Sequence, residues 1–180
     1  GKMTLSQADK RLHAAEIPAY VDGKPVVRIG EGLGGFKDCI YFAEVIIPDT
    51  VEEIGSCAFQ NTMLFEPEIP ESVSKIGFSA FEDCIWLQKI NIPGKVTTVE
   101  KNTFSGCVNL ESIDLHDKIE SIGDYAFLNC VTMKSLSIPS SVMKIGDYAF
   151  SGCTDLESIS VSPDNKFYYA SDGVLFKETH

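Results

Sequence analysis

The six cysteines of this chain could serve several chemical roles, since thiols can form disulfides, bind metals or act as nucleophiles. Five of them recur at one spacing, with a threonine taking one place in the series: Cys39, Thr62, Cys84, Cys107, Cys130 and Cys153. The chain has no C-x-x-C pair and no Cys/His pair at zinc spacing. Because threonine can replace cysteine, the position requires a small side chain rather than a sulfur atom. We therefore predict free structural thiols, with Cys57 outside the series, and no metal site.

The stretch IGEGLGGF has the G-x-G-x-x-G spacing of a dinucleotide-binding loop, at Gly30, Gly32 and Gly35. The acidic pair Glu52 and Glu53 follows about 20 residues later, as such a loop would require. However, Phe36 directly after the glycines lies 23 residues before Phe59, and this interval recurs along the chain. Nothing else in the sequence builds a strand–helix–strand unit. We therefore interpret the stretch as a turn with two extra residues, and predict no cofactor.

Other candidate catalytic residues are scattered. The three histidines, His13, His116 and His180, have no carboxylate or nucleophile at a recognisable spacing. Asp164, Asn165 and the pair Asp172-Gly173 are typical of tight turns, and they lack the spacing of a calcium-binding loop. We predict no catalytic residues, so the chain is not expected to be an enzyme; a site assembled from loops remains the alternative.

Charge and hydropathy narrow the class of partner. The 15 basic and 26 acidic residues give a net charge of −11, which disfavours nucleic acid and anionic membrane surfaces. No apolar run approaches the roughly 20 residues that span a bilayer, so direct membrane insertion is not expected. The polar start Gly1-Lys2-Met3-Thr4 shows no signal peptide. We expect an export signal to have been removed from upstream of it.

The elements that position these residues repeat with one period. One phenylalanine series advances in steps of 22 or 23 residues: Phe36, Phe59, Phe81, Phe104, Phe127 and Phe150. The repeating unit is L-x-x-I-x-I-P-x-x-V-x-x-I-G-x-x-A-F-x-x-C, and about seven units cover residues 12–161. YVDGKP is an insertion before Val26, and Pro67 replaces the isoleucine in an irregular unit. A period of this length predicts a solenoid.

Each unit contains two short extended pieces. L-x-x-I-x-I ends in an alternation of apolar and polar residues like that of a short half-exposed strand, and the following proline suits a strand end. V-x-x-I-G reads as a second extended piece, and A-F-x-x-C as a turn or a single helical turn. A unit this short cannot bury its own apolar face, so stacked units should bury Phe on Phe and Ile on Ile, with strands about 4.8 Å apart. The predicted fold is a mainly β solenoid.

Both ends of a solenoid need covering. Residues 1–11 are predicted to form an N-terminal capping segment, with Thr4 and Gln7 as a capping box for a short helix. Residues 162–180 are predicted to fold over the last unit as a hairpin about Asp172-Gly173, or as a capping insert that continues beyond His180.

The repeat unit resembles the BspA-like group of bacterial leucine-rich repeats over about nine tenths of the chain. IPAYVDGKPVVRIGEG is similar to the usual opening unit of that group, and SPDNKFYYASDGVLFKE to the strand-rich insert that follows its repeats. The resemblance implies a right-handed, curved solenoid with a parallel sheet on one face, exported to the cell surface or secreted. It implies adhesion or binding to proteins or glycans of a host or neighbouring cell, and brings no catalytic residues.

The outward positions of L-x-x-I-x-I form the candidate partner-binding face, because the apolar positions of that segment point inward. We select Glu44, Ile46, Phe65, Glu66, Glu68, Lys89, Asn91, Glu111 and Asp114. Ile46 and Phe65 would serve as adjacent apolar anchors within an acidic strip that docks a basic protein surface. Two alternatives stay open: a merely solvated face of an acidic protein, and a spacer whose repeats present another domain.

Overall fold

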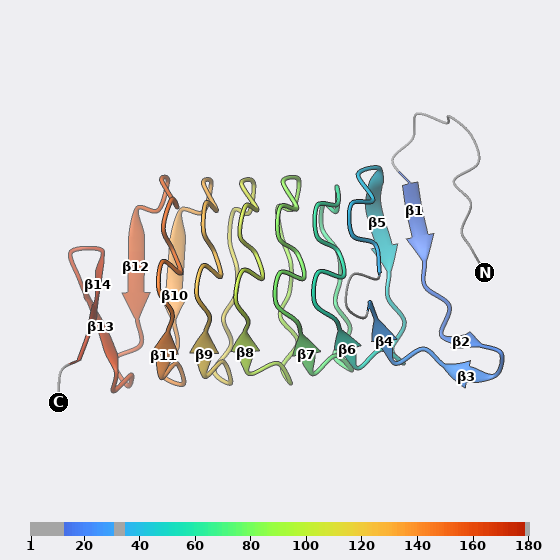
Figure 1. Cartoon of the computed structure of the whole chain (residues 1–180). Coiled ribbons are helices and arrows are strands. Elements are labelled where there is room, and N and C mark those ends of the chain that lie inside the picture. The colour runs from blue at the N-terminus through green and yellow to red at the C-terminus, as the bar shows by residue number, and fades with distance from the viewer. Residues whose placement is uncertain (1–12, 31–34, 179–180) are drawn as a thin grey trace.

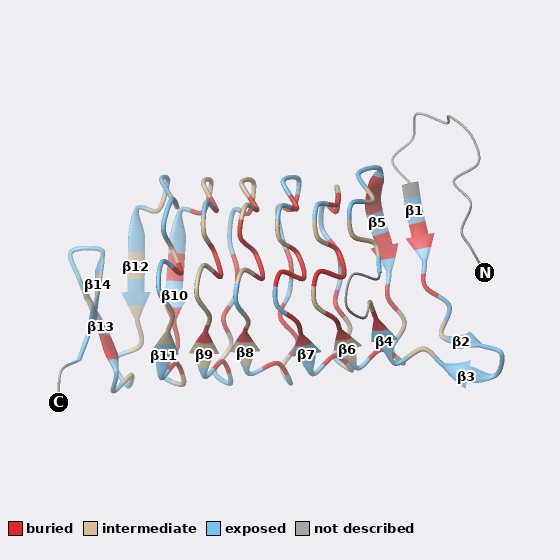
Figure 2. Cartoon of the chain, viewed as in Figure 1, coloured by how far each residue is buried: buried red, intermediate tan, exposed pale blue. Residues whose placement is uncertain are grey.

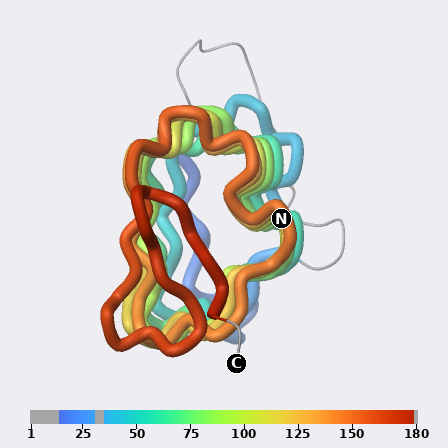
Figure 3. Tube along the Cα trace, turned by 90° about the vertical axis from the view of Figure 1, so that its left-hand side faces the viewer, coloured from blue at the N-terminus to red at the C-terminus, as the bar shows by residue number. Residues whose placement is uncertain are grey.

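The computed structural model describes residues 13–30 and 35–178 of the chain. The predicted N-terminal cap with Thr4 and Gln7, Gly32 of the glycine-rich stretch, and His180 lie outside the described residues. Successive coils stand side by side in one row (Figure 1), and an end-on view superimposes them on a common outline (Figure 3). The predicted solenoid is confirmed, and the described residues contain no helix.

The V-x-x-I-G segments form one side of the solenoid. They contain six two-residue strands: β4 (Arg28–Ile29), β6 (Glu53–Ile54), β7 (Lys75–Ile76), β8 (Thr98–Val99), β9 (Ser121–Ile122) and β11 (Lys144–Ile145). These strands pair in parallel as β4-β6-β7 and as β8-β9-β11. Each register sets isoleucine or valine against its equivalent, such as Ile54 beside Ile76 and Val99 beside Ile122. Each strand residue therefore pairs with the residue at the same position of the next repeat unit.

The L-x-x-I-x-I segments form the opposite side, where strand pairing among the described residues occurs near the two ends. β1 (His13–Glu16) pairs in parallel with β5 (Phe42–Ile46), and β10 (Ser135–Ile138) with β12 (Ser158–Val161). Residues 64–69, 87–92 and 110–115 follow the same path without forming strands. One backbone hydrogen bond joins the first two of these segments, from Gln88 N–H to Phe65 O at 2.9 Å. The predicted sheet on this side is thus interrupted.

The A-F-x-x-C segments turn without becoming helical, because residues on both sides of the A-F pair are left-handed. Two residues after phenylalanine, φ lies between 56° and 76° at Asn61, Asp83, Gly106, Asn129 and Gly152. Two residues before it, φ is also positive at Cys57, Ser79, Asn102, Tyr125 and Tyr148. Asn, Asp and Gly adopt this conformation at low cost, whereas tyrosine does so rarely. The second set could not be recognised from residue type.

The phenylalanine series forms a stack through the core. Consecutive rings lie 5.4–5.7 Å apart with interplanar angles of at most 15°. Phe59, Phe81, Phe104 and Phe127 are fully buried, while Phe36 and Phe150 near the ends are half-buried. Figure 2 shows buried positions recurring at the same place in the central coils. The predicted column of phenylalanines is confirmed.

The cysteine series forms a second column beside the phenylalanines. The thiols of Cys84, Cys107, Cys130 and Cys153 each donate a hydrogen bond, 3.0–3.2 Å long, to the carbonyl of a phenylalanine in the preceding coil. Thr62 donates to the Phe59 carbonyl of its own coil at 2.9 Å. All six cysteines are free, as predicted. Burial raises the pKa of Cys84 to about 11 and that of Cys107 well above its usual value.

We expect thiol titration to count close to six reactive groups once the protein is denatured without reductant. In native protein at neutral pH, the half-buried Cys39 and Cys153 should react first, because Cys84, Cys107 and Cys130 are buried and therefore inaccessible. Kinetics with a chromogenic disulfide reagent would measure both phases. A count near zero in denaturant would contradict the free-thiol column and indicate disulfides instead.

Two antiparallel hairpins extend the solenoid. β2 (Tyr20–Val21) and β3 (Lys24–Pro25) form the insertion before Val26. β13 (Tyr168–Ser171) and β14 (Val174–Lys177) form the predicted hairpin about Asp172-Gly173, where φ is 50° and 77°. Figure 3 shows this second hairpin lying across the end of the stack.

Asn165 and Tyr168 attach the C-terminal hairpin to the last coil. The Asn165 side-chain amide donates to the carbonyls of Pro139 and Val142, and its oxygen accepts from the N–H groups of Phe167 and Tyr168. The buried Tyr168 accepts the Ile145 N–H at 2.8 Å through its hydroxyl. These bonds occupy backbone groups of the last coil that would otherwise face solvent.

Candidate functional site

All nine residues of the candidate face are exposed. Ile46 has 63% and Phe65 has 43% of its surface exposed, which is high for large apolar side chains. The seven polar members of the set are exposed as well. The inward positions that alternate with them, such as Val45, Leu64 and Ile69, are buried. The alternation of the L-x-x-I-x-I segment thus orients this face even where no strand forms.

The L-x-x-I-x-I pattern also predicts an outward Ala43, because Phe42 takes the place of the leucine, and this prediction is wrong. The residue is 4% exposed. In the pairing of β1 with β5, His13 lies opposite Phe42 and Ala14 lies opposite Glu44, so Ala43 is the extra residue of a β-bulge. A bulge breaks the two-residue alternation of side chains, which explains the inward position of Ala43.

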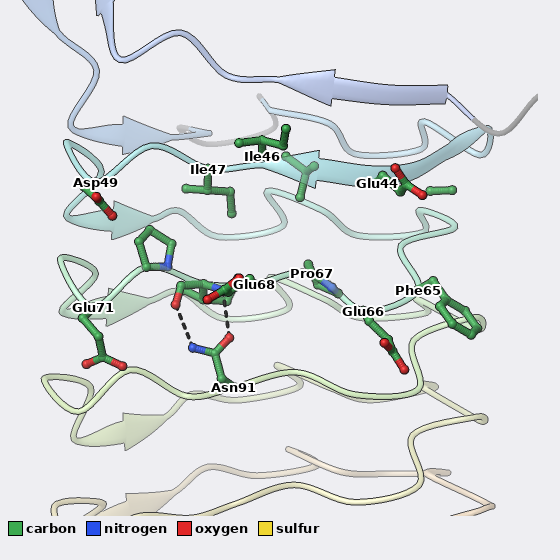
Figure 4. Close-up of a pocket in the computed structure, with 14 residues that line it drawn as sticks. Glu44, Ile46, Ile47, Asp49, Phe65, Glu66, Pro67, Glu68, Glu71 and Asn91 are labelled. Carbon is green, nitrogen blue, oxygen red and sulfur yellow. Dashed lines mark hydrogen bonds between the residues drawn. The ribbon is translucent and has the colours of Figure 1, made fainter.

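Six of the nine candidate residues line one groove between β5 and residues 64–69 (Figure 4). Its volume is about 770 Å³. The structure brings together Glu44, Ile46, Phe65, Glu66, Glu68 and Asn91 around it. Lys89, Glu111 and Asp114 do not contribute to its lining. We call this depression, with all the residues that line it, the acidic groove.

Two lining carboxylates were missed by sequence reasoning. Asp49 and Glu71 each follow the proline that ends the L-x-x-I-x-I-P segment, and they line one end of the acidic groove. Only the strand-like part of the unit was considered as a binding face. Both residues directly follow the proline of their unit, Pro48 or Pro70. A comparison of this position between successive units would have shown two carboxylates next to the predicted face.

The acidic groove lies where the parallel ladder beside β5 stops. Phe65 N–H donates to the Ala43 carbonyl at 3.2 Å, but two residues later Pro67 has no N–H to continue the ladder. The next donor, Ile69 N–H, instead bonds to the side-chain oxygen of Asn91 at 2.8 Å, and the Asn91 amide donates to Ile69 O at 2.7 Å. Among the described residues, no further backbone hydrogen bond joins β5 to residues 64–69.

The acidic groove is strongly anionic. Five carboxylates line it, and no lysine or arginine does: Glu44, Asp49, Glu66, Glu68 and Glu71. Within the described part of the chain, none of the five forms an ion pair; the ion pairs present join Glu53 to Arg28 and Lys75 on the other side of the solenoid. Their negative potential is therefore directed to solvent.

His116 and Gly35, two of the other candidate residues that the structure describes, contact the backbone of the solenoid. His116 contacts the Pro93 carbonyl through Nε2 at 3.0 Å and accepts the Lys118 N–H through Nδ1. A side chain at Gly35 would lie 2.8 Å from the Ala58 carbonyl oxygen, so glycine is needed there for the two coils to pack this closely.

In residues 13–30 and 35–178, no cluster of three His, Cys, Asp or Glu side chains is arranged to hold a metal. The same residues include no helix that could cross a membrane.

Comparison with known proteins identifies the repeat. The model of the BspA type leucine-rich repeat region matches residues 32–157, with six copies of the repeat. In a comparison with curated proteins, nothing matches.

Several solved structures are similar over most of the chain. A leucine-rich cell surface protein from Faecalibacterium prausnitzii is 33% identical with a TM-score of 0.70, covering 94% of this chain and 52% of that one. A leucine-rich repeat protein from Bacteroides ovatus is 34% identical with a TM-score of 0.61, covering 81% of this chain and 33% of its own. The T. pallidum leucine-rich repeat protein is 27% identical with a TM-score of 0.59, covering 81% and 57%.

The chain thus spans between a third and just over half of the length of these structures. The family model covers well over half of the chain, and the period, the Phe and Cys columns and the coil geometry agree with it. The chain belongs to the BspA-type leucine-rich repeat family.

Proposed function

We propose that this chain is a non-enzymatic binding module, displayed on or secreted from a bacterial cell, that contacts a protein or glycan through its L-x-x-I-x-I face. The observation that carries the proposal is the acidic groove, where exposed Ile46 and Phe65 lie among five carboxylates. Exposed apolar side chains rimmed by charge are typical of docking patches. Surface display is supported by the similarity to the Faecalibacterium prausnitzii cell surface protein.

Charge reversal on this face should abolish binding to a partner cell. We expect Glu66→Lys, Glu68→Lys and Glu111→Lys together to remove most attachment of the labelled protein to host or bacterial cells, and to remove the sensitivity of attachment to salt. The matched control reverses three exposed acidic residues outside this face, Glu52, Glu120 and Asp147. Attachment should be measured by flow cytometry at low and high ionic strength, after circular dichroism has shown both variants folded.

Two outcomes would contradict the proposal. Attachment that survives the triple reversal at both ionic strengths would exclude this face as the binding surface. Wild-type protein that attaches to no cell surface would favour the alternative, a structural spacer that presents another domain.

A further inference from the structure

We propose that the acidic groove binds an extended segment of a partner protein that carries several lysine or arginine side chains and at least one apolar side chain. This inference rests on the proposed binding function and names the class of ligand. A folded basic surface and a neutral glycan are the alternatives that remain if the experiment below gives a negative result.

The shape of the acidic groove suits an extended chain. Its two walls, residues 43–49 and 65–71, run side by side in the same direction. At about 3.3 Å per residue, each wall is roughly 20 Å long. A segment of about six extended residues would therefore fill the groove lengthwise, whereas a compact ligand would occupy one part of it.

Carboxylates are distributed along the whole length of the acidic groove. Figure 4 shows Glu44 and Glu66 towards one end, Glu68 between, and Asp49 and Glu71 towards the other end. A single small cation could not contact all five, and no metal-binding cluster is present among the described residues. Cationic side chains placed along a chain match this distribution. Because no cationic side chain lines the groove, the complement must come from the ligand.

The apolar side chains distinguish a peptide from a simple polycation. Ile46 projects from β5 and Phe65 from the opposite wall, with 63% and 43% of their surfaces exposed. Successive side chains of an extended peptide point to opposite sides. Such a peptide can direct an apolar residue onto Ile46 from one side or onto Phe65 from the other, and its cationic residues towards the carboxylates of the two walls.

The interrupted ladder supplies backbone hydrogen-bonding groups. The Ile46 carbonyl accepts the Ile17 N–H on the β1 side, so the neighbouring Val45 and Ile47 direct their backbone groups towards residues 64–69. Pro67 cannot donate to them, and Asn91 occupies the Ile69 N–H. Val45 and Ile47 line the acidic groove and, within the described residues, have no backbone partner on that side. Val45 and Ile47 are each 8% exposed, so only the part of these main-chain groups that opens into the acidic groove can hydrogen-bond an extended peptide, while side-chain pockets give specificity.

The experiment is isothermal titration calorimetry with three short, acetylated and amidated peptides. One alternates lysine with leucine, one alternates glutamate with leucine, and one alternates lysine with serine. We expect the lysine–leucine peptide to bind with an affinity that falls as salt rises, the lysine–serine peptide to bind at least tenfold more weakly, and the glutamate–leucine peptide not to bind.

A pair of variants localises the binding. E66Q with E68Q removes two carboxylates of the acidic groove and should weaken the lysine–leucine peptide about tenfold. E52Q with E120Q removes two exposed carboxylates of the V-x-x-I-G side, outside the binding face, and should leave the affinity within about twofold. An equal loss in both pairs would overturn the inference in favour of attraction by the overall negative charge of the protein.

The result is separable from the proposed function. If the lysine–leucine peptide does not bind, or binds no better than the lysine–serine peptide, an extended apolar–cationic segment is not the ligand. If attachment to cells still depends on Glu66, Glu68 and Glu111 in that case, the proposed binding function holds, and its partner is a folded surface or a glycan.

Discussion

Replacing Phe127 by alanine should lower the free energy of unfolding by about 3–5 kcal/mol, the usual cost of a large-to-small change at a fully buried aromatic residue. The ring has no exposed surface and lies between Phe104 at 5.5 Å and Phe150 at 5.7 Å. Because the coils on both sides are held by their own contacts, the cavity cannot collapse, and stacking with both neighbours is lost as well.

The matched variant is Phe36→Ala. Phe36 belongs to the same column and stacks on Phe59 and on Phe42, but it is half-buried at the N-terminal side, so its removal leaves less of a cavity. We expect it to cost clearly less than Phe127→Ala. Chemical denaturation followed by far-ultraviolet circular dichroism and by fluorescence of Trp86, the single tryptophan, would measure both variants. Equal and small losses at the two sites would show that the column does not carry the stability of the array.

Replacing Gly123 by alanine should destabilise the protein by about 1–3 kcal/mol, the range found for overpacked cores. A side-chain carbon at this position would lie 2.6 Å from the Lys101 backbone nitrogen and 2.8 Å from the Glu100 carbonyl carbon. Both are backbone atoms of the preceding coil, so neither can rotate away. The two coils must separate locally, which loosens the Phe and Cys columns between them.

Glu100 provides the control, because it occupies the same place in the preceding repeat unit and already carries a side chain. Glu100→Ala adds no atom and should change the stability by less than about 0.5 kcal/mol. Thermal denaturation of the two variants beside wild type is the measurement. A tolerated Gly123→Ala would mean that the spacing between these coils is not set by backbone contact.

The contacts at Gly123 and in the Phe column also explain how the binding face can be open. Because these contacts hold each coil against the next, the backbone on the L-x-x-I-x-I side can keep its path without strand pairing. Residues 64–69, 87–92 and 110–115 are joined by few backbone hydrogen bonds, yet their inward side chains Leu64, Leu87 and Leu110 are fully buried. The scaffold can therefore carry an open groove on one side at little cost to the core.

The repeat period, read from the sequence alone, determined the solenoid, the Phe and Cys columns, the in-phase pairing of isoleucines and the free thiols. The C-terminal hairpin lies outside the repeats and was predictable from its turn, since Asp172-Gly173 has a local conformational signature. The features of the repeats were predictable because each depends on residue type at a fixed position and on contacts with the nearest coil only. The outward direction of Ile46, Glu66 and Glu68 followed from strand alternation for the same reason, and that of Phe65 from its place after the buried leucine of the repeat unit.

The tertiary structure alone decided where the candidate site lies. The acidic groove needs Pro67 to end the ladder, Asn91 from the next coil to bind the Ile69 backbone, and Asp49 with Glu71 from the adjoining turns. The bulge that buries Ala43 depends on how β1 pairs with β5. The end of the ladder, the Asn91 contact and the bulge all depend on hydrogen bonding between segments at least 20 residues apart. Each occurs where one unit departs from the repeat. A periodic pattern predicts what the units share, so it could not predict a groove created by the residues in which they differ.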